Sequence, residues 1–399
     1  MSVPRPAAGP DRDSGPPEYA VARNKRQKVR AAGLDPDYWY PVEYERRVAP
    51  GHVVETRFWG RSIAVYRGSD GVLRALENRC AHRQLKLSGG EVNGCHLTCT
   101  YHGWTYDGDG KVVHYAHDLF GRAQPEVRVR SYPVTTRHGL IWIFPGSPDR
   151  AQQQAPPLIP ELEGPRPWAR IEADYLWRAH HSMIIDNVSD FTHAYLHRKY
   201  RPFWDAKLTH YESVGDTVRL SYRTKIGGGR FTGRFVDRGR VDTTSINLAF
   251  EYPYQRSDTG GSIKHWCFVL PMDHTTTRVF FIFYFDALKI PGTRMRVPRP
   301  FMGPLMKAAG ALAVRPLLRQ DGEAVEAEQQ GYEANYTAPI VELNPAVHLF
   351  QELTIRKWQE HLDREDRTGI RRNTRTGSAA RGDTRLRPSG TSGGTPPST

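Results

Sequence analysis

The feature of this chain that most constrains its fold is a pair of short loops that together offer two thiolates and two imidazoles. The first loop is Cys80-Ala81-His82 and the second is Cys99-Thr100-Tyr101-His102, with 16 residues between His82 and Cys99. Two cysteines and two histidines in this alternating order favour a [2Fe–2S] cluster, with cysteine on one iron and histidine on the other. A Cys₂His₂ zinc site is the alternative, although zinc fingers place both cysteines before both histidines.

The residues around these loops are typical of short strands separated by turns. Residues 62–66 and 72–76 are apolar runs of strand length, and Asp107-Gly-Asp-Gly110 is a hairpin signal. Residues 139–144 have the composition of a buried strand that closes the unit. The pattern predicts a small antiparallel β domain over 38–147, with both ligand loops at its tip.

A Pro-rich connection within 148–165 predicts a boundary, beyond which a second unit extends over 148–365. Strand and helix signals alternate less regularly there, which predicts an α+β unit of antiparallel strands flanked by helices. The expected strands are 217–222, 242–250, 263–270 and 277–285, and the expected helices are 176–197, 305–335 and 345–363.

A second set of ligand-type residues lies in the first of these helical stretches. In a continuous helix Asn187, Asp190, His193 and His197 fall on one stripe, with His193 and His197 one turn apart. This spacing allows two imidazoles to reach one metal, although such a pair alone is more often structural. The glutamate that a metalloprotease needs after the first histidine is absent, because Ala194 stands there. Two histidines with one carboxylate suit Fe(II) and O₂ activation.

Together the two motifs resemble those of Rieske non-haem iron oxygenases. The resemblance implies an α+β fold: a small antiparallel β Rieske domain, then a helix-grip-like antiparallel sheet with flanking helices. It implies Cys80, His82, Cys99 and His102 as ligands of the [2Fe–2S] cluster. For Fe(II) it implies His193, His197 and a carboxylate on a late helix, for which we select Asp321, with Glu323 and Glu326 as rivals.

The resemblance also implies roles for two further polar residues. Asp190 is expected to bridge His193 of one subunit to a cluster histidine of the neighbouring subunit, here His102, and so to carry the electron. Asn187 is expected to lie near the iron without a firm ligand role. This link between subunits is the reason that such enzymes form rings, and it predicts a homotrimer.

The implied function is that of a terminal oxygenase that hydroxylates or oxidatively demethylates an aromatic or natural-product substrate with O₂. No Gly-x-Gly-x-x-Gly nucleotide motif is present, so electrons are expected from NAD(P)H through a separate reductase, a ferredoxin or both. The apolar runs 301–318 and 283–285 are candidates for lining the substrate pocket. The alternatives are an electron carrier and a redox-sensing protein without oxygenase turnover.

Charge and hydropathy exclude other classes of function. The net charge is +13, but residues 1–30 contribute +4 and residues 366–399 contribute +5. These Pro-, Gly- and Arg-rich ends predict disordered tails over 1–37 and 366–399 rather than a nucleic-acid interface. No segment has the roughly 20 apolar residues of a membrane span. Four cysteines leave no disulfide framework, which predicts a cytoplasmic protein.

Overall fold

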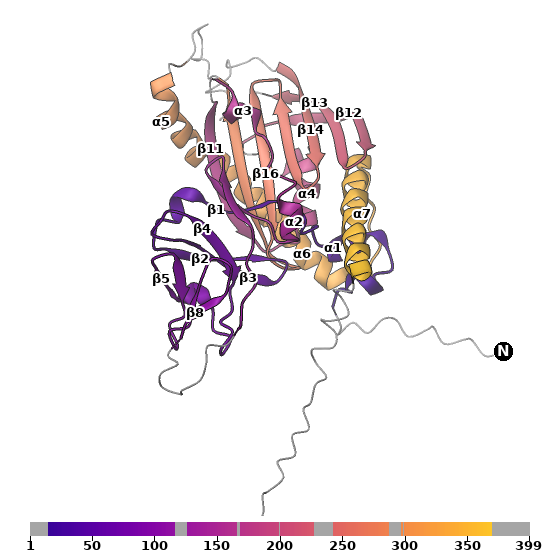
Figure 1. Ribbon diagram of the computed structural model, residues 1–399. Helices are drawn as coiled ribbons and strands as arrows, with labels where there is room; N and C mark the ends of the chain where they lie inside the picture. The colour runs from indigo at the N-terminus through magenta and orange to yellow at the C-terminus, as the bar shows by residue number, and fades with distance from the viewer. Residues whose placement is uncertain are drawn as a thin grey trace, which may run out of the picture. The chain divides into compact units, whose positions relative to one another are not determined.

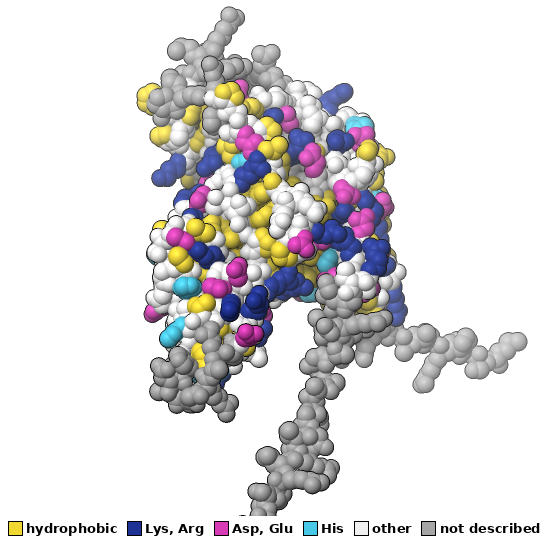
Figure 2. Space-filling view, in the orientation of Figure 1, with side chains coloured by type: hydrophobic (Ala, Val, Ile, Leu, Met, Phe, Trp, Pro, Cys, Tyr) yellow, Lys and Arg dark blue, Asp and Glu magenta, His cyan; other side chains and the backbone are white. Residues whose placement is uncertain are grey.

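A computed structural model describes residues 15–115, 126–165, 168–198, 200–226, 242–286, 297 and 299–368. Residues 1–358 form one compact unit, and residues 359–399 form a second one. Most of the two expected tails, residues 1–14 and 369–399, therefore lies outside the described residues. On the face drawn in Figure 2, basic and acidic side chains lie side by side over most of the described surface.

The N-terminal segment is ordered from residue 15, which corrects the prediction of a disordered tail over 1–37. A 3₁₀ turn, η2 (Tyr19–Val21), precedes the helix α1 (Lys25–Ala31), and Asn24 caps this helix by accepting a hydrogen bond from the Gln27 amide. The average composition of this segment does not show why it is ordered. The basic residues of this segment are interleaved with apolar ones, and Val29 is fully buried.

The chain next forms three small antiparallel sheets, as predicted for the N-terminal domain (Figure 1). Their strand orders are β1-β10-β9, β2-β3-β4 and β5-β6-β7-β8. The elements are β1 (Tyr40–Tyr44), η3 (Glu45–Arg47), β2 (Val53–Phe58), β3 (Arg61–Arg67), β4 (Leu73–Glu77), η4 (Leu87–Gly89), β5 (Glu91–Asn93), β6 (His96–Thr98), β7 (Thr105–Tyr106), β8 (Val112–His114), β9 (Val134–Arg137) and β10 (Leu140–Ile143). The predicted hairpin turn at 107–110 joins β7 to β8, closed by a hydrogen bond from the Gly110 amide to the Asp107 carbonyl.

Two short helices, α2 (Pro148–Ala151) and α3 (Pro160–Glu163), occupy the Pro-rich connection and lead into a seven-stranded antiparallel sheet. Its strand order is β11-β17-β16-β15-β14-β13-β12. The strands are β11 (Ala169–Trp177), β12 (Trp204–Val214), β13 (Thr217–Ile226), β14 (Asp242–Glu251), β15 (Tyr254–Thr259), β16 (Ile263–Pro271) and β17 (Thr277–Phe285). Four of these were predicted as strands. β12 and β15 were not, and β11 was missed because its end was assigned to a helix.

The remaining helices are α4 (His181–Ser189), the 3₁₀ turn η6 (His193–Tyr195), α5 (Arg299–Ala309), the π-helical turn η8 (Gly310–Val314), α6 (Arg315–Asn335) and α7 (Pro345–Thr368). Other parts of the chain pack against both faces of the large sheet. On one face Phe268 and Phe280 pack with Trp142 and Phe144 of the N-terminal β region. On the other face, which we call the inner face, α6 packs over Trp177. No helix among the described residues is long and apolar enough to cross a membrane.

Candidate active site

The two ligand loops of the N-terminal β region lie side by side at its tip. Cys80 and Cys99 are 2% and 3% exposed, whereas His82 and His102 are exposed. The two imidazole rings are 4.6 Å apart, and the Trp104 ring stacks on that of His82 at 5.0 Å. The two buried thiols and the two exposed imidazoles form one set of metal donors, in which the histidines face the solvent.

Backbone hydrogen bonds hold each loop in a tight turn around its cysteine. The Gln84 amide donates to the Cys80 carbonyl at 2.9 Å, and the Gly103 amide donates to the Cys99 carbonyl at 3.0 Å. Gly103 has a φ of +69°, a conformation that glycine adopts without strain. The Tyr106 hydroxyl lies 3.2 Å from Cys80 Sγ. Burial raises the pKa of the Cys99 thiol, and nearby backbone amides oppose that rise by donating to its sulfur.

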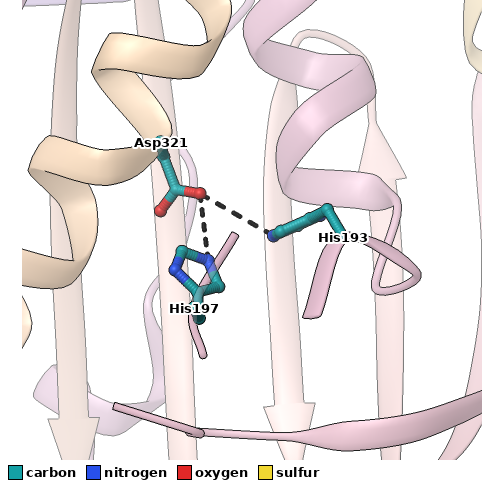
Figure 3. A group of neighbouring side chains, drawn as sticks. All are labelled: His193, His197 and Asp321. Atoms are coloured by element: carbon teal, nitrogen blue, oxygen red, sulfur yellow. Dashed lines mark ion pairs between the residues drawn. The ribbon is translucent and has the colours of Figure 1, made fainter. Parts of the chain in front are cut away.

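The second donor set consists of His193, His197 and Asp321, whose ligand atoms all lie within 4.8 Å of one another (Figure 3). Asp321 Oδ1 is 3.2 Å from His197 Nε2 and 3.7 Å from His193 Nε2. This oxygen is buried, and no donor within the described residues makes a hydrogen bond to it. Two imidazole nitrogens and an unsatisfied carboxylate oxygen that converge on one point fit a divalent transition metal.

The local backbone differs from the predicted continuous helix over 176–197. β11 extends to Trp177, and α4 ends at Ser189 because Asp190 is extended, with φ −105° and ψ 101°. The Asp190 carboxylate accepts a hydrogen bond from the Thr192 amide at 2.8 Å, a local turn that competes with helix continuation. His193 lies in the short turn η6. The two histidines therefore converge through a turn, and not along one face of a helix.

Neighbouring side chains hold the three donors in place. Gln320 Oε1 lies 3.1 Å from His197 Nδ1, so Nδ1–H donates to it and Nε2 keeps its lone pair for a metal. Gln320 was not singled out from the sequence, although it directly precedes Asp321. Burial opposes protonation of His197, but the Asp321 carboxylate raises the pKa of this imidazole overall. For His193, burial prevails and lowers the pKa.

The structure places the remaining candidates outside the triad. Glu323 is exposed, and Glu326 accepts a hydrogen bond from the Arg178 amide at 2.9 Å, so neither rival of Asp321 joins the donor set. Asp190 and Asn187 line a surface groove of about 580 Å³ that also reaches His193. Its floor and rim are Asn24, Lys25, Arg26, Arg30, Asp186, Asn187, Asp190, His193, Glu328, Ala338, Pro339, Ile340, Glu342, Val347, His348 and Gln351.

Comparison with known proteins identifies the family. Residues 38–126 match the Rieske [2Fe-2S] domain, and residues 177–365 match the vanillate O-demethylase oxygenase C-terminal domain. A 4beta-methylsterol monooxygenase of Methylococcus capsulatus is 43% identical over 347 residues, which cover 86% of this chain and 94% of that protein. The chain is a Rieske oxygenase. The predicted family, fold class and enzyme class are thereby confirmed.

Other relatives show how the fold recurs. The dicamba O-demethylase oxygenase component of Stenotrophomonas maltophilia is 37% identical over 142 residues, 34% of this chain and 40% of that protein. The crystal structure of dicamba monooxygenase bound to 3,6-dichlorosalicylic acid aligns with a TM-score of 0.67 at 23% identity. It covers 83% of this chain and 99% of that one. The oxygenase of carbazole 1,9a-dioxygenase, solved in a ferredoxin complex, aligns with a TM-score of 0.57 at 18% identity, over 83% and 91%.

Proposed function

We propose that this Rieske oxygenase hydroxylates a methyl group of a sterol-like substrate. The observation that carries the proposal is the similarity to 4beta-methylsterol monooxygenase over nearly the whole of that protein. The inner face of the large sheet supports an apolar substrate, because it presents Leu220, Leu248 and Phe283 from three of its strands. Overall, a methyl C–H bond and O₂ would yield a hydroxymethyl group and water, with two electrons and two protons supplied from outside.

In this proposal Cys80, Cys99, His82 and His102 hold the [2Fe–2S] cluster, and His193, His197 and Asp321 hold Fe(II). When bound, the iron supplies the activation of O₂. Gln320 fixes the tautomer of His197, and α6 positions Asp321 where burial keeps bulk water away, since this side chain is only 10% exposed. The substrate would be held against the inner face of the sheet, where the three donors lie.

The groove beside the triad supports a role for Asp190 between subunits. Asp190 and His193 both line it, and His193 Nδ1 is buried without a hydrogen-bond partner in the described structure. A carboxylate that accepts one hydrogen bond from His193 Nδ1–H and another from His102 of a neighbouring copy would connect the two donor sets. The exposed tip that carries His82 and His102 supplies the complementary element. We therefore propose a head-to-tail ring, a homotrimer, in which Asn187 only borders this contact.

Electrons for this reaction would come from NAD(P)H through a separate reductase or ferredoxin. The exposed imidazoles at the tip support an external donor, since they offer a short path to the buried sulfur atoms. None of the four cysteines, all of which lie among the described residues, forms a disulfide, which supports the prediction of a reducing, cytoplasmic setting.

The test is turnover combined with metal analysis. Anaerobically purified protein, with a surrogate ferredoxin and reductase, is given a 4,4-dimethylsterol under ¹⁸O₂, and the product is analysed by mass spectrometry. We expect one ¹⁸O atom in a hydroxymethyl product and three irons per chain. His193→Ala should contain two irons, keep the electron paramagnetic resonance signal of the reduced cluster and form no product.

Three other results would contradict the proposal at different levels. Three irons without any sterol product, but with conversion of an aromatic methyl ether, would replace the sterol with the ether as substrate class. Two irons in wild type and in His193→Ala alike, after full iron supply, would leave the chain as an electron carrier. A redox sensor would show three irons and no substrate-dependent consumption of O₂.

A further inference from the structure

The inner face of the large sheet carries a polar pair at its centre. The register aligns Ser257 of β15 with His265 of β16, and His265 with Phe283 of β17. Side chains directly opposite one another on antiparallel strands are close enough to act on one group. On either side of this pair the same row continues with apolar residues, Leu248 on β14 and Ile171 beyond Phe283 on β11.

His265 has no hydrogen-bond partner for its buried nitrogen. The Nε2 atom is inaccessible to solvent and makes no hydrogen bond in the described part of the chain. The ring stacks on two aromatic side chains of β17, on Phe283 at 4.4 Å and 13° and on Phe281 at 5.5 Å and 17°. Ser257, which is 8% exposed, lies directly opposite His265 on β15. An imidazole with an unsatisfied nitrogen and a hydroxyl group are thus neighbours on an apolar surface.

The pair lies on the sheet face against which the two segments that carry the metal-ligand triad pack. On one side α6, which carries Asp321, packs so closely that a Cβ on Gly322 would lie 2.5 Å from Trp177 of β11. On the other side Phe191, just before His193, contacts the Tyr222 ring of β13 at 5.7 Å. β15 and β16 run between these two strands in the sheet, and Figure 3 shows strands passing behind the three donors.

This central surface is also incompletely covered. Ile263, two residues before His265 on the same face, is 38% exposed, and His265 and Phe283 are partly exposed. By contrast Tyr284, which the sequence suggested as a pocket residue, points to the opposite face and is fully buried there. We call the Ser257–His265 pair the polar notch. A partly exposed apolar surface that carries this notch is complementary to an apolar molecule with one oxygen.

We propose that Ser257 and His265 bind the single oxygen of an otherwise apolar substrate, here the hydroxyl of a sterol, while Phe283 contacts its ring system. The inference rests on the proposed function and adds to it the residues that recognise the polar end. A neutral imidazole has one donor and one acceptor nitrogen, and a serine hydroxyl can do both, so together they satisfy an alcohol in either direction.

The same surface argues against an acidic ligand. The inner-face positions of β15, β16 and β17 contain no lysine, arginine or acidic residue. Burial lowers the pKa of His265 to about 3, so the ring is uncharged at neutral pH. A carboxylate would therefore lose its hydration without gaining a cation, which is unfavourable. The notch selects an alcohol over an acid.

The test compares two ligands that differ only in this oxygen. A 4,4-dimethylsterol with a 3-hydroxyl group and its 3-deoxy counterpart, both carried by cyclodextrin, are measured by equilibrium dialysis against the full-length protein loaded with iron and cluster. The variants are His265→Phe, which preserves an aromatic ring, and His265→Gln, which restores a donor and an acceptor. Ser257→Ala removes the second group. His210→Phe, on the exposed face of an edge strand, is the matched control.

We expect the wild type and His210→Phe to prefer the hydroxylated ligand by about tenfold, equivalent to about 1.4 kcal/mol. His265→Phe should lose this preference while its affinity for the deoxy ligand is kept. Ser257→Ala should lose part of it and His265→Gln should recover part. Iron content and the resonance signal of the cluster show that each variant is folded.

If wild type and His265→Phe prefer the hydroxylated ligand equally, the assignment of Ser257 and His265 as the binding site of the hydroxyl group is wrong. The proposal that the protein is a sterol oxygenase would not be affected. The absence of binding of both ligands to the fully loaded wild type would overturn the sterol proposal, and the notch with it. Tighter binding of a steroid carboxylate than of the sterol would overturn the selection for an alcohol.

Discussion

At the scale of single residues, a buried ion pair ties the N-terminal helix to the catalytic region. Arg30 of α1 lies 2.8 Å from Asp186 of α4, and their side chains are only 6% and 12% exposed. Arg30 also contacts Glu328 of α6 at 2.9 Å and donates to the Ser182 hydroxyl. The guanidinium thus joins two helices that flank the triad, and a segment that composition alone assigned to a tail becomes part of the scaffold.

Arg30→Met should destabilise the protein by about 3–5 kcal/mol, because it leaves a buried carboxylate without its partner. Burial raises the pKa of Asp186 from 3.8 to about 6. Keeping this carboxyl ionised in the folded protein therefore lowers the free energy of unfolding, and this cost is fully present above pH 6. In the variant its pKa rises further, and the deficit relative to wild type should grow between pH 5 and pH 8. Thermal unfolding at both pH values measures it.

The control for this prediction is the double variant Arg30→Met, Asp186→Asn. The second substitution removes the Asp186 charge that Arg30→Met leaves without a partner. The double variant should therefore recover much of the lost stability, and its deficit relative to wild type should not grow with pH. A deficit of the same size at pH 5 and pH 8 would mean that Arg30 acts through its aliphatic packing alone.

Asp190 allows a second prediction at this scale. Asp190→Asn keeps the size of the side chain but removes its charge, and it should lower the rate of product formation by about 10- to 100-fold, as loss of a carboxylate behind a metal-binding histidine does. Three irons per chain and the cluster signal should persist. Glu212→Gln removes a carboxylate from the edge strand β12, outside the residues that line the groove, and it should leave the rate unchanged. Equal losses in both variants would mean that the position of Asp190 does not determine the effect.

At the scale of elements, the fit of α6 against β11 positions Asp321. Gly322 lies against the Trp177 indole, so a methyl group there must push the helix away from the sheet. Gly322→Ala should therefore reduce the iron content from three toward two per chain. Gly331→Ala, on the same helix with no atom within 4 Å of the new Cβ, should bind iron normally and gain up to about 1 kcal/mol of stability from helix propensity. Metal analysis and thermal unfolding of the two variants check this, and full iron occupancy in Gly322→Ala would contradict it.

The helices and strands also show which parts of the structure could be predicted from the sequence and which could not. The strand at 277–285 was predicted with both ends correct, because β-branched and aromatic residues fill it. The edge strand β12 was missed, since exposed polar residues interrupt its pattern. The triad was predicted from residue types and the family resemblance, but the helical stripe behind that prediction was wrong: the Asp190 side chain ends α4, a local competition that periodicity does not reveal.

At the scale of the molecule, an apolar rim beside the groove supports the proposed ring. In the segment 340–343, Val341 is 84% exposed and Leu343 is 85% exposed, and Ile340 lines the groove itself. Exposed apolar side chains that cluster at one place commonly mark a protein interface. The sequence could not have revealed this, since burial by a partner leaves no periodic signal in so short a segment.

Val341→Asp should convert a trimer into monomers and lower product formation, because a charge would be buried in the contact between subunits. Size-exclusion chromatography with light scattering gives the mass, and the ¹⁸O₂ assay gives the rate. Val214→Asp, at a position that is 60% exposed at the end of β12, should remain trimeric and active. A trimer that withstands Val341→Asp would place the contact elsewhere, and a monomeric wild type would exclude the ring.

The triad draws its donors from two segments of the chain, His193 and His197 on one side and Asp321 on the other, and most of the large sheet lies between them in sequence. Loops of this length close late in folding, because contacts between distant residues form slowly. The emerging chain therefore has the four donors at its N-terminal tip more than 200 residues before it has Asp321. Maturation should follow the same order during synthesis: the cluster can be inserted into a partly made chain, whereas the mononuclear iron must wait for a finished sheet.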